Sequence, residues 1–280
     1  MHKVSIIVPV YNEEAHLAQV IEMLMRSPAP VSPATGAPVS REWIFVDDFS
    51  KDQSLRILNK MAVRHGFRVL AQPRNHGKGA AVIRGIHEAT GEVILVQDAD
   101  FEYDPADLPA LIAPILEGRA DVVYGSRFKK SASQVHRTYH YFVNRFLTLV
   151  SNLFSGIYLT DMETCYKVFR ADLIKAMNLK CQRFGIEVEM TAYVAKIRAR
   201  IFELPISYFP RTRLQGKKIG WKDGVAALYF LVRFNCFTSI AKAFTRVPAR
   251  YLGASEAASA SAEPEVIAAE PDPGKGKSSG

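Results

Sequence analysis

The sequence is poor in cysteine, and the apolar run near its start is short. Its 280 residues include three cysteines, Cys165, Cys181 and Cys236, which form neither a C-x-x-C pair nor an even set. This spacing argues against a disulfide framework and a cysteine zinc site, and it favours a reducing compartment. The apolar run Val4–Val10 is too short for a signal peptide. We therefore expect a cytoplasmic protein.

Long hydrophobic runs are also missing. The most apolar segment, Gly224–Phe244, is interrupted by Arg233, Asn235 and Lys242, and it falls short of the roughly 18 apolar residues that a membrane-spanning helix needs. The segment is instead typical of an amphipathic helix that packs against a partner or lies on a membrane surface without crossing it.

Charge and composition indicate a folded chain with an anionic partner. Hydrophobic residues make up 48% and charged residues 23%, and 36 Lys and Arg against 28 Asp and Glu give a net charge of +8. Residues 253–280 consist almost entirely of small, polar and acidic residues, which predicts a disordered tail. An excess of positive charge favours a nucleotide, a phosphate, a nucleic acid or an acidic lipid surface.

The first half of the chain alternates β-branched runs with helical spacing, and a proline-rich loop over residues 27–40 interrupts it. This alternation predicts an α/β fold with a mainly parallel, Rossmann-like sheet between helices. After Gly125 the pattern changes, and we expect the parallel sheet to end there. Helices are predicted over residues 139–154 and 187–198. The predicted strands are Val4–Val10, Trp43–Val46, Arg68–Ala71, Val93–Gln97, Val122–Gly125 and the later Ile201–Ile206.

Acidic, polar or glycine-rich residues follow each of the first four predicted strands. Ligands of open parallel sheets bind beyond the carboxyl ends of the strands, so these residues are expected to meet in one crevice. Asp98 and Asp100 follow an apolar strand, and Glu102 offers a further oxygen. Mg²⁺ takes one or two carboxylates together with substrate phosphates, so the motif suits a divalent cation. The alternative is that these acids only cap the next helix.

Other strand-end residues suit a nucleotide. Asp48 can accept hydrogen bonds from a base or a ribose, whereas Asp52 fits a helix cap. The glycines of Gly77-Lys78-Gly79 allow a backbone to approach a phosphate and Lys78 adds charge, although a tight turn explains the glycines equally well. Arg127 follows the last predicted parallel strand and can clamp a diphosphate.

Five motifs, taken together, resemble the family-2 glycosyltransferases. They are PVYNE (residues 9–13), VDDFSKD (46–52), NHGKGAAVIRG (75–85), QDADFEYDP (97–105) and GSRF (125–128). Within that family the chain is similar to the polyprenyl-phosphate glycosyltransferases, the group of dolichyl-phosphate mannose synthase, over about residues 3–225. The resemblance implies a GT-A fold, a nucleotide-diphosphate sugar linked to UDP or GDP, Mg²⁺ or Mn²⁺ as cofactor, and inversion at the anomeric carbon.

The resemblance also assigns residues. The nucleoside contacts would be Pro9, Tyr11, Glu13 and Asp48, and the metal ligands would be Asp98, Asp100 and Glu102, where many relatives have Gln in place of Glu102. Arg127 would bind a phosphate of donor or acceptor. The stretch DMETCYKVF (residues 161–169) also matches the group and places Asp161 and Glu163 near the transferred sugar.

The chemistry of a transfer reaction fits these residues. A nucleoside diphosphate leaves readily once its charge is neutralised, a task for the metal, Lys78 and Arg127. A lipid phosphate acceptor is already an anion and needs no general base, whereas a hydroxyl acceptor would need one, and Asp161 is the predicted base for that case. The sequence leaves both acceptors open.

The acceptor side is expected to be basic and aromatic. Arg211 and Lys217 lie in RTRLQGKKI, which resembles the group's basic loop, and a polyprenyl phosphate at a membrane surface would suit such a rim. The alternative is a solvated, charged surface. Several members of the group have C-terminal transmembrane helices that this sequence lacks, so we expect a peripheral enzyme.

These observations predict three regions: a catalytic domain over residues 1–210, a basic loop with an amphipathic helix over 211–252, and the tail over 253–280. Two rival functions are a nucleotidyltransferase, which would release pyrophosphate, and a nonenzymatic nucleotide-binding protein. No nucleic-acid-binding motif is evident, so no nucleic-acid partner is expected. A homo-oligomer stays open.

Overall fold

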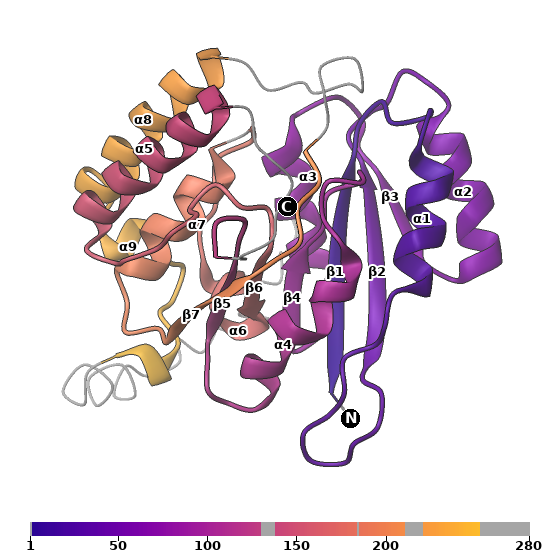
Figure 1. Ribbon diagram of the computed structural model, residues 1–280, viewed down its shortest axis with the longest axis horizontal. Helices are drawn as coiled ribbons and strands as arrows, with labels where there is room; N and C mark the ends of the chain where they lie inside the picture. Colours follow the sequence, from indigo (N-terminus) through magenta and orange to yellow (C-terminus); the bar gives the residue numbers. More distant parts are fainter. Residues whose placement is uncertain (1, 130–137, 184, 211–220, 253–280) are drawn as a thin grey trace, which may run out of the picture.

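The computed structural model describes residues 2–129, 138–183, 185–210 and 221–252 (Figure 1). The elements in chain order are β1 (Lys3–Val10), α1 (Leu17–Arg26), β2 (Ser40–Asp47), α2 (Ser54–His65), β3 (Arg68–Ala71), α3 (Lys78–Glu88), β4 (Val93–Val96), η1 (Pro105–Asp107), α4 (Leu108–Leu116), β5 (Val122–Ser126), α5 (Thr138–Ser155), β6 (Lys167–Arg170), α6 (Ala171–Ala176), α7 (Ile186–Ala195), β7 (Ile201–Pro205), α8 (Trp221–Cys236), α9 (Ile240–Ala243) and η3 (Ala249–Tyr251).

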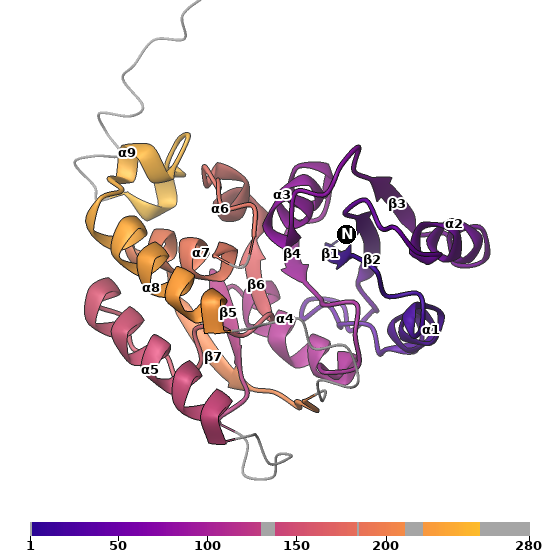
Figure 2. The same cartoon turned by 90° about the horizontal axis from the view of Figure 1, so that it is seen from above.

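The strands form one sheet in the order β3-β2-β1-β4-β6-β5-β7. Strands β3, β2, β1 and β4 are parallel neighbours, and β1 is paired with β2 over its whole length, from Lys3 opposite Ser40 to Val10 opposite Asp47. Helices α3 and α6 lie on one side of the sheet, and α1 and α4 on the other (Figure 2). The predicted α/β fold with a mainly parallel sheet is confirmed.

The strands at the centre of the sheet are apolar on both faces because helices cover both. Seven of the eight residues of β1 are buried, and all four residues of β4 are buried. Parallel strands covered on both sides are typically near-continuous Val and Ile runs, which is why the predicted strands match the observed ones within a few residues.

The expectation that the parallel sheet ends after Gly125 is wrong. Strand β7 pairs in parallel with β5, from Val122 opposite Ile201 to Ser126 opposite Pro205. Strand β6, which the sequence reading treated only as a polar motif, enters between β4 and β5 and is antiparallel to both. Its four residues, Lys167–Arg170, begin and end with a basic side chain, so they lack the continuous apolar run by which the equally short β4 was predicted.

The segment Gly224–Phe244 is not one helix but two, because the chain leaves helical geometry after Cys236 and starts α9 at Ile240. Helix α8 packs against α5 and α7 at the end of the molecule away from α1 and α2 (Figures 1 and 2). Among the described residues, no helix combines the length and hydropathy required to cross a bilayer. The division at residue 211 stays a prediction, and the tail lies outside the described residues.

Candidate functional site

The loops after β1 and β2 hold each other in place at the carboxyl edge of the sheet. The Lys51 amide donates to Asn12 Oδ1 at 2.8 Å, the Gln53 amide donates to Glu14 Oε2 at 2.8 Å, and the Glu14 amide donates to Asp52 Oδ2 at 3.1 Å. Asp52 thus joins the two loops, and its Oδ1 accepts the Ser54 amide at 2.9 Å at the start of α2, whose N-cap residue is Gln53 and not Asp52. The two motifs PVYNE and VDDFSKD form one platform.

Backbone strain is concentrated on the same platform. Among the described residues, Asn12 (φ 51°) and Phe49 (φ 62°) are the non-glycine residues with left-handed backbone. That conformation costs an ordinary L-residue about 1–2 kcal/mol, and asparagine tolerates it better than phenylalanine. Such strain persists where the surroundings enforce it and is frequent at ligand-binding sites. It marks the ends of β1 and β2 as a candidate site.

Asp48 organises the next loop of the crevice. Its Oδ1 accepts hydrogen bonds from Gln72 Nε2 at 3.0 Å and the His76 amide at 2.9 Å. Its Oδ2 accepts from Asn75 Nδ2 at 2.8 Å and the Gly77 amide at 2.7 Å. The Asp48 carboxylate thus occupies the anion position at the start of α3, so it shapes the loop before Lys78. Its contact with a nucleoside stays a prediction.

The glycines around Lys78 are required by protein packing. A Cβ on Gly77 would lie 2.6 Å from the Gln182 carbonyl oxygen, and one on Gly79 would collide with the Cys181 carbonyl oxygen. The Ala80 amide also donates to the Gln182 carbonyl at 3.0 Å. The close backbone approach that glycine permits is thus made here by residues 181–183 of the same chain, which fixes Lys78 against α7.

Lys78 joins two acidic residues from different elements. Its Nζ lies 2.8 Å from Asp98 Oδ1, at the end of β4, and 3.0 Å from Glu187 Oε1, on α7. Burial alone would lower the pKa of Lys78, but the charges of Asp98 and Glu187 outweigh it and hold that pKa well above its usual value. Lys78 is therefore a permanent cation in the crevice.

The remaining predicted metal residues lie beside an aromatic wall. Asp100 is buried and its Oδ1 accepts the Glu102 amide at 2.9 Å, and Glu102 Oε2 accepts the Tyr208 hydroxyl at 2.8 Å. The described part of the chain holds no group of three or more His, Cys, Asp or Glu arranged to hold a metal ion. A cation that takes two carboxylates and completes its shell with substrate phosphate does not need three protein ligands. Asp98 and Asp100 fit that requirement.

Arg127 and Asp161 form a buried bidentate ion pair. Arg127 Nε lies 2.7 Å from Asp161 Oδ2, Arg127 Nη2 lies 2.7 Å from Oδ1, and the Arg127 amide donates to Oδ2 at 2.9 Å. The guanidinium also lies over the Tyr208 ring at 5.1 Å. Burial would lower the pKa of Arg127, but Asp161 raises it well above its usual value. Both oxygens of the predicted base are therefore engaged by a permanent cation.

Glu203 on β7 holds Asp161 in position. Its Oε1 accepts the amides of Thr160 at 2.8 Å and Asp161 at 3.1 Å, and its Oε2 accepts the Thr160 hydroxyl at 2.9 Å. Lys129 Nζ lies 3.1 Å from the same carboxylate. Sequence reasoning missed Glu203 because its partners are about 42 residues away in the chain. The sequence pattern that could have indicated Glu203 is its position as an acidic residue inside the otherwise apolar run Ile201–Pro205.

Buried side-chain oxygens without a partner among the described residues gather around this crevice. They are Asp47 Oδ1, Glu163 Oε1, Thr164 Oγ1 and Glu187 Oε2, and Tyr251 has the fifth such atom. A buried polar atom with no hydrogen bond costs about 1–3 kcal/mol, so each of them needs an explanation. A ligand that donates hydrogen bonds would supply it.

Glu163 stands out in this group because its charge is disfavoured. Burial raises the pKa of Glu163, the charge of Glu187 raises it further, and it reaches about 7 despite nearby Lys167 and Arg127. Burial lowers the pKa of Lys167, whose Nζ donates to the Met162 carbonyl at 2.7 Å. The crevice therefore contains one carboxyl group that titrates near neutral pH.

The other predicted residues divide into two groups. Pro9 is the next-to-last residue of the buried strand β1, and Tyr11 and Glu13 follow that strand on the platform. Arg211 and Lys217 lie outside the described residues, so their role stays a prediction. Glu187, which the sequence reading placed only within a helix, joins the predicted residues in the crevice.

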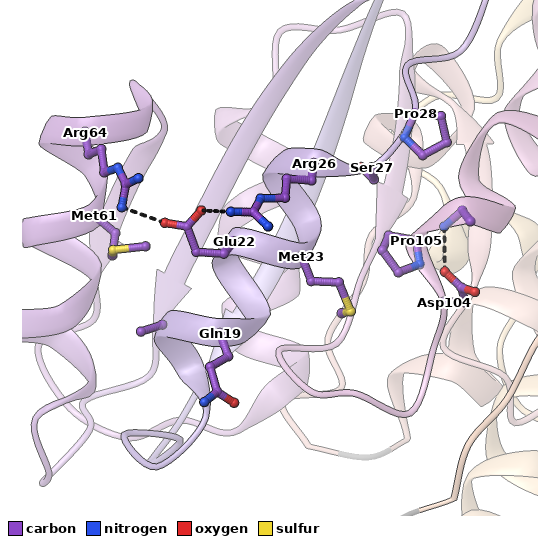
Figure 3. A pocket seen from close by; sticks show the side chains of 12 residues that line it. Gln19, Glu22, Met23, Arg26, Ser27, Pro28, Met61, Arg64, Asp104 and Pro105 are labelled. Atoms are coloured by element: carbon purple, nitrogen blue, oxygen red, sulfur yellow. Dashed lines mark hydrogen bonds and ion pairs between the residues drawn. The ribbon is translucent and has the colours of Figure 1, made fainter.

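A separate groove of about 760 Å³ lies between α1, α2 and the loop at Asp104 and Pro105 (Figure 3). Its wall contains Glu22, whose Oε1 pairs with Arg64 Nη1 at 2.9 Å, together with the apolar side chain of Met23. No residue predicted to bind nucleotide, metal or sugar lines this groove. The strand-end crevice is thus defined by its side chains, and this groove is a different feature of the surface.

Curated relatives match most of the chain. The model of the family described as "Glycosyl transferase family 2" matches residues 5–177. The undecaprenyl-phosphate 4-deoxy-4-formamido-L-arabinose transferase of Proteus mirabilis is 27% identical over 254 residues, which are 90% of this chain and 71% of that protein. The transferase of the same name from Klebsiella pneumoniae is 30% identical over 241 residues, 85% of this chain and 68% of that protein.

Solved structures share the fold. Glucosyl-3-phosphoglycerate synthase from Mycobacterium tuberculosis, in complex with Mn²⁺, UDP and glucosyl-3-phosphoglycerate, superposes with a TM-score of 0.62 at 18% identity, over 84% of this chain and 80% of that one. The same enzyme with Mg²⁺ and UDP gives 0.61 at 18% identity, over 84% and 79%. The fold is the GT-A fold. With its five motifs on the carboxyl edge of that fold, and with the family model spanning most of its length, this chain belongs to glycosyltransferase family 2.

Proposed function

We propose that this protein transfers a hexose or related sugar from a nucleotide-diphosphate sugar to a polyprenyl phosphate, with inversion at the anomeric carbon. Support comes from the family, from relatives named undecaprenyl-phosphate transferases, and from the crevice itself. The observation that carries the choice of acceptor is the Arg127–Asp161 pair. An acid whose oxygens both accept from a permanent cation is a poor general base, whereas a phosphate acceptor needs none.

The divalent cation, Mg²⁺ or Mn²⁺, would be held by Asp98 and Asp100, with Glu102 beside them. When bound, it would neutralise charge on the diphosphate leaving group. Lys78 has a second carboxylate partner in Glu187, so Asp98 can turn an oxygen towards a cation without leaving Lys78 unpaired. Glu102 already accepts the Tyr208 hydroxyl, which favours a supporting role for it.

Residues on both sides of the crevice would hold the donor. The platform at Tyr11, Glu13 and Asp48 would hold the nucleoside, and Lys78 and Arg127 would face the phosphates. The partnerless oxygens of Glu163 and Glu187 would accept hydrogen bonds from hydroxyl groups of the transferred sugar. These contacts would give each of the two carboxyl groups a hydrogen bond for the oxygen that has none in the described part of the chain.

The transfer step is a single displacement. An oxygen of the lipid phosphate attacks the anomeric carbon and forms the new C–O bond. The bond between that carbon and the diphosphate oxygen breaks, and the nucleoside diphosphate departs with the electron pair. Lys78 and Arg127, which stay charged at every working pH, stabilise the negative charge that builds up on the leaving group.

The state of the cysteines supports a cytoplasmic location. All three cysteines are free, and Cys165 and Cys181 are buried, which suits a reducing environment. We place the enzyme in the cytoplasm, at the membrane that holds its lipid acceptor.

A matched pair of acceptors tests the proposal. The full chain is incubated with labelled UDP- or GDP-sugars, Mn²⁺, and either a polyprenyl phosphate or the polyprenol of the same length. Transfer to the phosphate and none to the alcohol is expected. Transfer to the alcohol alone would overturn the choice of acceptor, release of pyrophosphate would indicate a nucleotidyltransferase, and nucleotide binding without any product would indicate a nonenzymatic protein.

A further inference from the structure

Large apolar side chains are exposed mainly at one end of the molecule. Of the sixteen in the described part of the chain, seven lie within residues 141–158 and five within residues 225–240. Leu153 is 76% exposed, Phe142 64% and Tyr229 61%. Scattered apolar residues on a surface are ordinary, but a contiguous group of this size marks an interaction surface.

The group forms two stripes on neighbouring helices. On α5 the exposed positions follow helical spacing, and so do those on α8, while the opposite sides of both helices are buried. The two helices lie side by side in both views (Figures 1 and 2). We call this surface the α5/α8 face; it consists of Phe142, Phe146, Leu149, Leu153, Val225, Tyr229 and Val232.

The charged residues on and after the two helices are mainly basic. Residues 138–160 and 224–252 contain no Asp or Glu, although the first turn of α8 contains Asp223. Arg145 on α5 and Arg233 on α8 are exposed, and so are Lys242, Arg246 and Arg250 in the segment after α8, where Arg250 pairs with Asp172 at 3.2 Å. Elsewhere the chain is rich in acids, with 28 in total. An apolar, partly aromatic stripe bordered by Lys and Arg matches the interface of a bilayer with anionic headgroups. A second copy would instead place positive charge against positive charge.

The α5/α8 face is continuous with the crevice. Arg145 on α5 donates to the Thr160 carbonyl at 3.1 Å, next to Asp161, and lies 5.8 Å from the Phe128 ring centroid. The Arg127 guanidinium contacts the same ring, with its Cζ 5.7 Å from the Phe128 centroid. Arg145, which lies on α5 between the stripe residues Phe142 and Phe146, is thus in contact with residues that flank the Arg127–Asp161 pair.

We propose that the α5/α8 face lies on the surface of a bilayer containing anionic lipid, and that the lipid phosphate acceptor enters the crevice past Arg145 and Phe128. This inference rests on the proposed function for the identity of the acceptor, but the surface itself does not. The apolar stripe enters the headgroup region, and the basic residues contact the lipid phosphates around it.

Vesicle sedimentation tests the surface. The full chain is mixed with vesicles of phosphatidylglycerol and phosphatidylcholine, or of phosphatidylcholine alone, and the bound fraction is measured. We expect strong binding to the anionic vesicles that falls with added salt, and weak binding to the neutral ones. The double variant Arg233→Glu/Lys242→Glu should weaken binding by about tenfold or more. Arg56→Glu/Lys60→Glu, the same charge change on exposed positions of α2, is the control and should retain most of the binding.

A second pair of variants measures how much the apolar side chains contribute to vesicle binding. Leu153→Ser should reduce binding, whereas Val63→Ser, on a side chain that is 89% exposed on α2, should not. Both residues are exposed, so the melting temperature should be unchanged and folding is not at issue. Equal binding by wild type and the α5/α8 variants would overturn the proposal. So would a dimer in sedimentation velocity that Leu153→Ser converts to monomer, because a second copy would then cover the face.

Activity distinguishes this inference from the proposed function. With a short-chain, water-soluble polyprenyl phosphate and no vesicles, Leu153→Ser should turn over like wild type. In vesicles it should lose activity. Vesicle binding without any sugar transfer would contradict the proposed function and leave the surface standing, whereas transfer with wild-type dependence on vesicles in all variants would contradict the surface.

Discussion

The buried Arg127–Asp161 ion pair is expected to make a large contribution to the free energy of unfolding. Arg127 is 8% exposed and Asp161 is fully buried. A buried pair is costly to break because one charge is left without its partner, typically about 3–5 kcal/mol. In the proposed reaction, this pairing makes Asp161 a poor general base and keeps the Arg127 guanidinium available to stabilise negative charge.

Asp161→Asn tests this role. The substitution keeps the shape but leaves the Arg127 guanidinium without a negative partner, so we expect a loss of about 3 kcal/mol in the free energy of unfolding. Denaturant titration measures it. The exposed pair of Arg64 and Glu22 provides the control, since Arg64→Gln should cost less than about 1 kcal/mol. Equal effects of the two substitutions would contradict the account.

Glu163 makes stability depend on pH. Its pKa is about 7 in the folded protein, against 4.5 as the ordinary value, so the folded state binds the proton more tightly than the unfolded state. The free energy of unfolding should therefore fall as pH rises from about 4.5 to about 7, by at most about 3 kcal/mol from this group.

Glu163→Gln should remove that dependence. The variant should gain stability relative to wild type at pH 8 compared with pH 5, as measured by urea unfolding at both values. Glu88→Gln, at an exposed carboxylate, is the control. If the free energy of unfolding of Glu163→Gln differs from that of wild type by the same amount at pH 5 and pH 8, the raised pKa of Glu163 is contradicted.

At this scale, residue types were predictable and pairings were not. Asp98 and Arg127 stand out in the sequence because they follow apolar strands, Lys78 because it lies between two glycines, and Asp161 through the resemblance of residues 161–169 to the family. That Lys78 would contact Glu187, or that Asp161 would be saturated by Arg127, depends on side chains brought together from more than 30 residues apart. A single sequence does not contain that geometry.

At the scale of elements, the contact between the start of α3 and residues 181–183 is the tightest constraint in the crevice. Two glycines permit it, and it sets where Lys78 lies relative to α7. The loop before α3 is in turn held by the Asp48 carboxylate. A change in this contact should therefore affect both stability and donor binding.

Gly79→Ala should destabilise the protein by about 1–3 kcal/mol, because its new methyl group collides with the Cys181 carbonyl and the backbone must shift. It should also weaken nucleotide binding. Gly224→Ala is the matched control: its Cβ would meet only Val143 Cγ1 at 3.9 Å, and within α8 alanine should be stabilising by up to about 1 kcal/mol. Thermal melts with and without nucleotide measure both effects. A neutral Gly79→Ala would contradict the packing argument.

Element prediction succeeded where periodicity was strong. The strands of the parallel half are buried on both faces, and helices such as α3 have clear apolar spacing, so both were predictable. Strand β6 has four residues with charged ends, and the pairing of β7 with β5 joins segments about 79 residues apart. Pairing over such distances is set by the packing of the whole sheet, which no local pattern encodes.

At the scale of the whole molecule, acidic and basic residues are concentrated in different regions. Acids and buried cations line the carboxyl edge of the sheet, while residues 138–160 and 224–252 carry only basic charge around an apolar stripe. The positive net charge predicted an anionic partner without locating it. In the structure Arg145 of α5 contacts the Thr160 carbonyl and the Phe128 ring, which is why we propose that a lipid acceptor reaches the crevice from this side.

One measurement tests the central claim most directly: the stoichiometry of the reaction products. The full chain, Mn²⁺, a labelled nucleotide sugar and a polyprenyl phosphate in anionic vesicles are incubated, and both products are quantified. We predict one nucleoside diphosphate for each sugar transferred to the lipid phosphate, with loss of both products in Arg127→Ala. Pyrophosphate in place of the nucleoside diphosphate, or full activity in Arg127→Ala, would contradict the account.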